Sequence, residues 1–146
     1  RTPDWVAAGY DAYAKRLPRE CSLHLVEIEP GRRRRGERPA LALREEEARL
    51  TAALPRGARA VALDERGTAW STAQLADALA GWMADGRDLA LLVGGPDGLP
   101  RACRSRAERI WSLSPLTFPH QLVRVLVAEQ LYRAWSILQG HPYHRA

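Results

Sequence analysis

Residues 89–98 read LALLVGGPDG, and this stretch decides the fold class. Its first half, residues 89–93, is wholly apolar, which is typical of a strand buried on both faces of a sheet. The glycines of residues 94–98 then allow the backbone to turn sharply. A second wholly apolar run, AVAL at residues 60–63, predicts another strand, which a turn at residues 64–67 should end.

Helical patterns lie between and around these two strands. Ser71 with Gln74 three residues later forms a capping-box pattern, and the apolar spacing that follows predicts a helix packed through Leu75, Leu79 and Trp82. Towards the start of the chain, helical spacing stops at Pro18 and again at Pro55.

Three further elements complete the predicted pattern. The alternation over residues 23–28 predicts a half-exposed strand. A short helix is predicted at about residues 100–109, followed by a strand at residues 110–113 and a long helix at about residues 120–138.

Alternating helices and apolar strands predict an α/β fold with a parallel sheet flanked by helices. Ligands of such sheets bind in the loops beyond the carboxyl ends of the strands. Three segments leave strands in this way, at residues 63–67, 94–98 and 114–119. We therefore expect a small-molecule site where these three segments meet.

Length and composition narrow the class of protein. The 146 residues predict a single domain, and the absence of a long apolar run argues against a membrane span or a secretory signal. Cys21 and Cys103 are too few for a disulfide framework or a four-cysteine zinc site, which suits a reducing cytosol.

The formal net charge is +5, and Lys15 is the single lysine among 22 cationic residues. This arginine bias fits either a GC-rich coding habit or a partner that carries phosphates. Four consecutive arginines, Arg32 to Arg35, form a basic loop. Their neighbouring like charges predict a solvated loop, which is either without function or suited to contact phosphates.

Few side-chain patterns point to catalysis by themselves. The glycine-rich residues 94–98 match neither a GxGxxG fingerprint nor a Walker loop, so a tight turn is the simpler interpretation. His141 and His144 have a spacing that a metal could use, but no cysteine or carboxylate lies nearby in sequence, and no metal site is predicted. The tail, in which a bend is expected at residues 140–142, ends in Tyr143, His144 and Arg145 and is either a frayed end or a functional segment.

Several motifs together resemble the RlmH family, whose members are bacterial methyltransferases that modify N3 of a pseudouridine in 23S ribosomal RNA. The resemblance rests on Leu63-Asp64 with Gly67 and Ser71, on LVGGPDG at residues 92–98, and on Pro3-Asp4-Trp5-Val6. Its most specific part is the closing run at residues 113–145, LSPLTFPHQLVRVLVAEQLYRAWSILQGHPYHR. The likeness covers nearly the whole chain.

The resemblance implies a SPOUT-type α/β fold with a C-terminal trefoil knot, a cytoplasmic homodimer, and S-adenosylmethionine as the methyl donor. By matching positions, the cofactor pocket should comprise Leu63, Gly94, Leu113, Ser114, Pro115, Leu116, Thr117 and Phe118. Pro115 departs from the family, where a smaller residue is common. The family also usually opens with an apolar strand and a glycine turn before Pro3, so one strand of the sheet is expected to be missing from residues 1–146.

For the chemistry, Arg133 and Arg145 should stabilise the anion formed when the pseudouridine imide loses its proton. His144 is a candidate proton acceptor, and Tyr143 should stack on or orient the base. The expected substrate is ribosomal RNA, with the assembled ribosome as the favoured form. Two alternatives stay open: a SPOUT methyltransferase that acts on transfer RNA, and an RNA-binding protein without catalysis.

Overall fold

The computed structural model describes residues 2–29, 39–95 and 98–145 of the chain. The chain divides into two compact units. The helical unit comprises Arg1–Leu25, Trp70–Gly86 and Phe118–Ala146, and the sheet unit comprises Val26–Ala69 and Arg87–Thr117.

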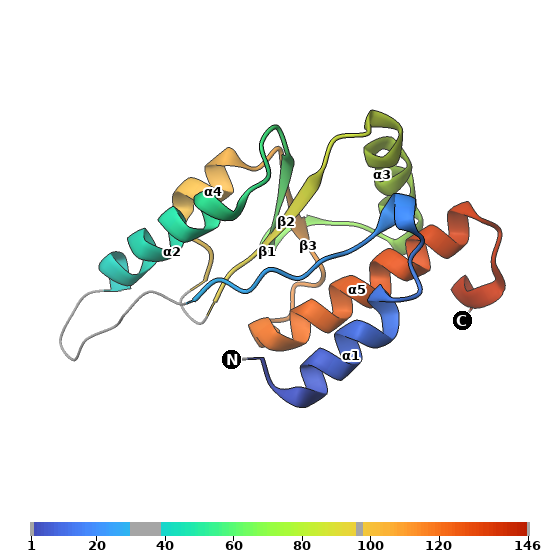
Figure 1. Ribbon diagram of the computed structural model, residues 1–146, viewed down its shortest axis with the longest axis horizontal. Helices are drawn as coiled ribbons and strands as arrows, with labels where there is room; N and C mark the ends of the chain where they lie inside the picture. Colours follow the sequence, from blue (N-terminus) through green and yellow to red (C-terminus); the bar gives the residue numbers. More distant parts are fainter. Residues whose placement is uncertain (1, 30–38, 96–97, 146) are drawn as a thin grey trace. The chain divides into compact units, whose positions relative to one another are not determined.

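The sheet unit is built on three parallel strands, as the apolar runs predict (Figure 1). The strands are β1 (Arg59–Ala69), β2 (Leu89–Val93) and β3 (Arg109–Ser112), in the order β2-β1-β3. Because β1 lies in the centre, Leu63 is paired with Val93 on one side and with Trp111 on the other. The α/β class with a parallel sheet and flanking helices is confirmed.

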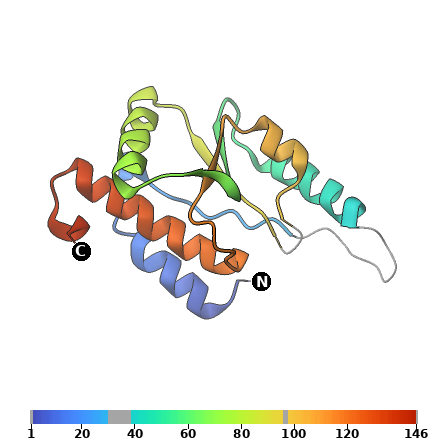
Figure 2. The ribbon, with the colours of Figure 1, turned by 180° about the vertical axis from the view of Figure 1, so that it is seen from behind.

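One face of β1 packs under two helices, α2 (Pro39–Ala53) and α4 (Arg101–Arg106), which lie side by side in both ribbon views (Figures 1 and 2). Successive strand residues point to opposite faces, so Ala60 and Ala62 share this core. Its other buried members are Leu92, Leu99 and Cys103, with Leu50 of α2 and Leu54, just beyond α2, packed against them.

The turn predicted at residues 64–67 does not end the strand. The register of β1 against β3 shifts between Leu63 and Thr68, and pairing resumes with Thr68 opposite Trp111. The backbone of β1 thus finds hydrogen-bond partners on β3 again after an irregular excursion. A Cβ built on Gly67 would lie 2.5 Å from the Ile110 carbonyl oxygen, so the return to β3 requires a glycine there.

The prediction of a strand at residues 23–28 is wrong. A 3₁₀ turn, η1 (Arg19–Cys21), is followed by residues without strand pairing, and Val26 is 63% exposed. An alternating pattern predicts a half-buried face, but it supplies no neighbouring backbone to pair with.

The next predicted boundaries also move. Helix α4 ends at Arg106 instead of near residue 109, and β3 covers Arg109–Ser112 instead of residues 110–113. The reason is that the Glu108 amide donates to the Ala60 carbonyl at 2.9 Å, which joins the chain to the sheet before another helical turn can form.

The helical unit centres on α5 (His120–Leu138), which packs against α1 (Asp4–Ala14), α3 (Thr72–Asp85) and η2 (Pro142–His144). The capping box predicted for α3 is present, with Ser71 Oγ accepting from the Gln74 amide and the Gln74 side chain accepting from the Ser71 amide. Among the described residues, each helix is too short or too polar to span a lipid bilayer.

Candidate functional site

Three of the predicted pocket residues begin at one edge of the sheet. Leu63 pairs with Val93 on β2 and with Trp111 on β3, and Gly94 follows Val93 directly. Since all three strands are parallel, the irregular part of β1 after Leu63 starts beside the segments that leave the carboxyl ends of β2 and β3. The structure therefore brings Leu63, Gly94 and the chain entering Leu113 to the same edge.

The loop at residues 113–117 is held by its own hydroxyl groups. Ser112, which is 2% exposed, places its Oγ 3.0 Å from the Glu65 carbonyl oxygen and 2.9 Å from that of Ser114. Ser114 Oγ accepts from the Leu116 amide at 3.0 Å, which makes a compact local turn. Pro115 and Leu116 lie at the exposed tip of this turn.

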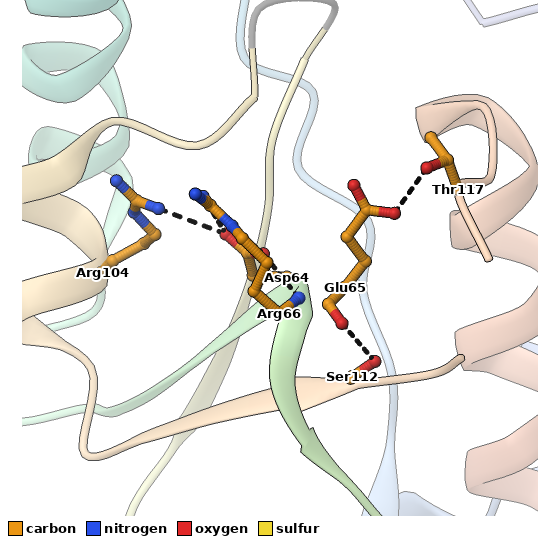
Figure 3. Close-up of polar contacts among 6 residues, drawn as sticks. All are labelled: Asp64, Glu65, Arg66, Arg104, Ser112 and Thr117. Atoms are coloured by element: carbon orange, nitrogen blue, oxygen red, sulfur yellow. Dashed lines mark hydrogen bonds and ion pairs between the residues drawn. The ribbon is translucent and has the colours of Figure 1, made fainter. Parts of the chain in front are cut away.

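Thr117 fixes the far end of the same loop. Its Oγ1 donates to a carboxylate oxygen of Glu65, on the opposite side of Glu65 from Ser112 (Figure 3). Glu65 thus binds both ends of the loop, through its backbone carbonyl and through its side chain. Hydrogen bonds within the chain therefore hold the loop at both of its ends.

Gly94 is required by the chain's own backbone. A Cβ at this position would lie 2.5 Å from the Gly98 carbonyl carbon and 2.5 Å from the Leu99 nitrogen. The Gly98 amide also donates to the Gly95 carbonyl at 2.9 Å, so the segment folds back on itself. The tight turn expected for residues 94–98 is present at its described ends. That the Gly94 backbone approaches a cofactor stays a prediction.

Asp64 carries the strongest charge interaction at this edge. Its carboxylate forms ion pairs with Arg66 at 3.0 Å and with Arg104 of α4 at 3.4 Å (Figure 3). Hydrogen bonds from Arg66 are the largest cause that lowers the pKa of Asp64 to about 2. A side chain that is ionised in this way anchors the irregular part of β1 to α4.

The tail folds back at the bend expected at residues 140–142. Gly140 has a φ of 68°, in the left-handed region that favours glycine. The His141 amide donates to the Ser136 carbonyl at 2.8 Å and the Gly140 amide to the Ile137 carbonyl at 3.2 Å. This pair of bonds is a Schellman motif, which ends α5 and turns the chain into η2.

Arg133 and Tyr143, both predicted to be catalytic, meet at Glu129. Arg133 Nη2 lies 2.7 Å from Glu129 Oε2, and the Tyr143 hydroxyl donates to the same oxygen at 2.8 Å. The guanidinium also lies 5.0 Å from the centre of the Tyr143 ring. Burial, followed by the bond to Glu129, raises the pKa of Tyr143 well above its usual range, so the phenol stays protonated.

His144 and Arg145 follow at the end of η2. His144 Nδ1 contacts the His141 carbonyl oxygen, and because a carbonyl can only accept, Nδ1 must carry the hydrogen. In the neutral ring, Nε2 is then the nitrogen with a free lone pair. The Arg145 side chain is exposed, and its backbone amide donates to the Pro142 carbonyl at 3.0 Å.

Glu65, Asp64 and Glu129 organise these groups, although the sequence analysis gave none of them a role in the site and named Asp64 only within the Leu63-Asp64 motif. Glu129 lies four residues before Arg133, the spacing at which helical side chains form ion pairs. The Glu129–Arg133 ion pair could therefore have been predicted from the sequence. The position of Glu65 depends on the register shift of β1 against β3. No local sequence pattern predicts this shift.

Phe118 and the arginine run, both predicted to be functional, do not lie with the residues described above. Phe118 belongs to the helical unit, whereas the remaining predicted pocket residues belong to the sheet unit. Arg32 to Arg35 lie outside the described residues. Within the described part of the chain, no cluster of three His, Cys, Asp or Glu residues could hold a metal ion.

Comparison with known proteins identifies the class. A family model described as "Predicted SPOUT methyltransferase" matches residues 1–144, and the chain belongs to this SPOUT methyltransferase family. A relative from Alkalilimnicola ehrlichii is 65% identical over 146 residues, covering 100% of this chain and 94% of its own length. A second, from Methylococcus capsulatus, is 59% identical over 145 residues, covering 99% of this chain and 94% of its own. Both relatives are named ribosomal RNA large subunit methyltransferase H.

Proposed function

We propose that this chain transfers a methyl group from S-adenosylmethionine to N3 of a pseudouridine in 23S ribosomal RNA. Relatives named as large-subunit ribosomal RNA methyltransferases, 53–65% identical over the full chain, support the substrate class. The structural observation that carries the proposal is the hydrogen-bonded loop at residues 113–117, which starts at the same edge of the sheet as Gly94 and lies near Leu63 in sheet register. The expected location is the cytoplasm, where ribosomes are found.

The residues at this edge fit S-adenosylmethionine. Leu113 and the exposed Leu116 offer apolar surface for a purine next to the buried Leu63, and the loop offers backbone groups for its polar edge. The Glu65 carboxylate suits a ligand that carries cationic groups. When bound there, S-adenosylmethionine would supply the methyl group as an electrophile on its sulfonium sulfur.

The tail residues would prepare the nucleophile. N3 of pseudouridine carries an imide proton, which His144 Nε2 would accept, and Arg145 would stabilise the resulting anion. The N3 anion, with its charge matched by Arg145, would then be the nucleophile that takes up the methyl group. Tyr143 stays protonated, so its role is to orient or stack on the base.

The charge of Arg133 is largely matched by Glu129 in the described structure. We therefore assign the closer contact with the substrate anion to Arg145, and to Arg133 the orientation of Tyr143. Of the two arginines expected to stabilise the anion, Arg145 keeps that role in the proposal, and Arg133 takes a positioning role instead.

Two features of the proposal concern assembly. The segment 113–145 threads a trefoil knot, and two chains associate through it. The apolar stripe of α5 that would serve a dimer comprises Leu122, Val125, Leu126 and Leu131. Part of it is used within the chain, because Leu131 is 6% exposed and Val125 lies against Gly9 of α1. Light scattering at micromolar concentration tests the dimer, and a monomer mass would refute it.

The basic run Arg32 to Arg35 is proposed to contact phosphates and so to position the ribosomal RNA. Replacing all four with serine should flatten the salt dependence of ribosome binding while leaving affinity for S-adenosylmethionine unchanged. If the salt dependence of ribosome binding is unchanged, these arginines are only solvent-exposed loop residues.

The deciding experiment measures transfer of a labelled methyl group to three acceptors: ribosomes that lack the modification, free 23S RNA and transfer RNA. We expect label in the ribosomal RNA, with assembled ribosomes as the best acceptor. Preferential labelling of transfer RNA would favour a different SPOUT enzyme. Binding of RNA without any transfer would favour an RNA-binding protein without catalysis.

A further inference from the structure

Glu129 lies at the point where the C-terminal tail meets helix α5. Its Oε2 accepts hydrogen bonds from Arg133 Nη2 at 2.7 Å, from Arg133 Nε at 3.1 Å and from the Tyr143 hydroxyl at 2.8 Å. Its Oε1 accepts from the Gln130 side chain at 2.9 Å. The side chain is only 16% exposed, so these bonds are shielded from competing water.

These contacts leave the Tyr143 ring little freedom. Its hydroxyl is held by Glu129, its face lies over the Arg133 guanidinium, and its edge meets the Tyr132 ring with centroids 4.6 Å apart. His144 and Arg145 follow Tyr143 directly in the chain. The contacts that hold Tyr143 therefore also set the backbone position of His144 and Arg145.

The surroundings of Glu129 come from two helices and the tail. Arg133 and Gln130 of α5 and Tyr143 of η2 contact it, and the Tyr13 side chain of α1 contacts Tyr143. Arg16, just beyond α1, lies 5.5 Å from the Tyr13 ring and 5.6 Å from the Tyr132 ring. Glu129 is thus the acceptor that joins two proposed catalytic residues.

We propose that Glu129 is a positioning residue for methyl transfer, which holds the tail through Tyr143 and orients Arg133 toward the Tyr143 ring. The inference rests on the proposed function and adds to it a residue that need not touch the RNA or the cofactor. Loss of the carboxylate should release the Tyr143 hydroxyl and leave His144 and Arg145 poorly placed. Misplacement by about 1 Å is enough to cost a large factor in rate.

The test compares Glu129→Gln, Tyr143→Phe and the double variant in steady-state methylation of modification-free ribosomes. Asp77→Asn on α3 is the matched control, because it removes one exposed carboxylate from the same unit. We expect Glu129→Gln to lower kcat on the order of tenfold or more, with the KM for S-adenosylmethionine unchanged. The double variant should be no slower than the slower single variant, because both changes act on the one contact between residue 129 and Tyr143.

A spectroscopic signature separates positioning from general stability. The phenol absorbance of Tyr143, obtained by difference from Tyr143→Phe, should titrate at lower pH in Glu129→Gln than in the wild type. The sign follows because a neighbouring carboxylate opposes ionisation of the phenol. Asp77→Asn should leave both kcat and this titration unchanged.

A kcat for Glu129→Gln within twofold of the wild type would overturn the inference, as would rate losses that multiply in the double variant. If Glu129→Gln fails to fold, Tyr143→Phe carries the test, and an unchanged kcat there would also overturn it. A wild-type protein that transfers no methyl group would instead refute the proposed function, so the two failures are distinguishable.

Discussion

Thr117 donates a hydrogen bond to the carboxylate of Glu65, which lies 52 residues earlier in the chain. This contact joins the end of the proposed cofactor loop to the irregular part of β1 (Figure 3). The loop is therefore ordered by strand β1 as well as by its own serines, and its order can be tested one hydroxyl group at a time.

Replacing Thr117 with valine keeps the shape of the side chain and removes the donor. We expect affinity for S-adenosylmethionine to fall several-fold, corresponding to about 1 kcal/mol for one hydrogen bond. Isothermal titration calorimetry measures the change. Thr51→Val, at an exposed position on α2, should leave affinity unaltered. Equal affinity in the wild type and Thr117→Val would show that the contact does not order the binding loop.

Gly94→Ala should destabilise the fold itself. The new methyl group would lie 2.5 Å from the Gly98 and Leu99 backbone, and such overpacking costs about 1–3 kcal/mol of unfolding free energy. Urea denaturation followed by circular dichroism gives the value. Gly81→Ala is the control, since nothing lies within 4 Å of its added Cβ and alanine favours a helix by about 0.5–1 kcal/mol. Similar effects at both glycines would contradict the close approach at Gly94.

Asp64→Asn should lower stability in a way that depends on pH. The pKa of Asp64 falls from the ordinary 3.8 to about 2 on folding, so ionised Asp64 stabilises the folded state above pH 4. Arg66 is 73% exposed, and water screening limits the difference between variants to about 1 kcal/mol at pH 7. The difference should shrink as the pH falls from 4 towards 2. A stability difference that is constant from pH 7 to pH 3 would exclude this ion pair as its cause.

Arg145→Ala should lower kcat far more than it raises the KM for ribosomes, because an anion-stabilising cation acts mainly in the transition state. A loss on the order of a hundredfold is expected from removal of one electrostatic contact. Arg145→Lys should recover part of the lost kcat, and Arg56→Ala, at an exposed position, should behave as the wild type.

Deletion of residues 143–146 should abolish methylation while sparing affinity for S-adenosylmethionine. Full activity in that truncated chain would remove the tail from the mechanism.

The central strands and the cap of α3 could be predicted from the sequence because their signals are local. A wholly apolar run such as residues 89–93 needs burial on both faces, and Ser71 with Gln74 satisfies free amides within one turn. The failed strand at residues 23–28 shows the limit, since alternation does not provide a backbone partner.

In the candidate site, too, features with local sequence signals could be predicted and features that depend on distant residues could not. Gly140 marks a bend that local geometry demands, and the Schellman bonds confirm it. Glu65 acquires its role only through the register shift of β1 against β3, which joins residues far apart in sequence. The knot belongs to the family resemblance, because hydrophobic periodicity carries no information about threading of the chain.

The central claim is tested most directly by nucleoside mass spectrometry of 23S RNA after incubation of modification-free ribosomes with the protein and isotopically labelled S-adenosylmethionine. The account predicts one labelled methyl group per large subunit, carried at N3 of a pseudouridine. Absence of labelled pseudouridine, or label at another nucleoside, would contradict it.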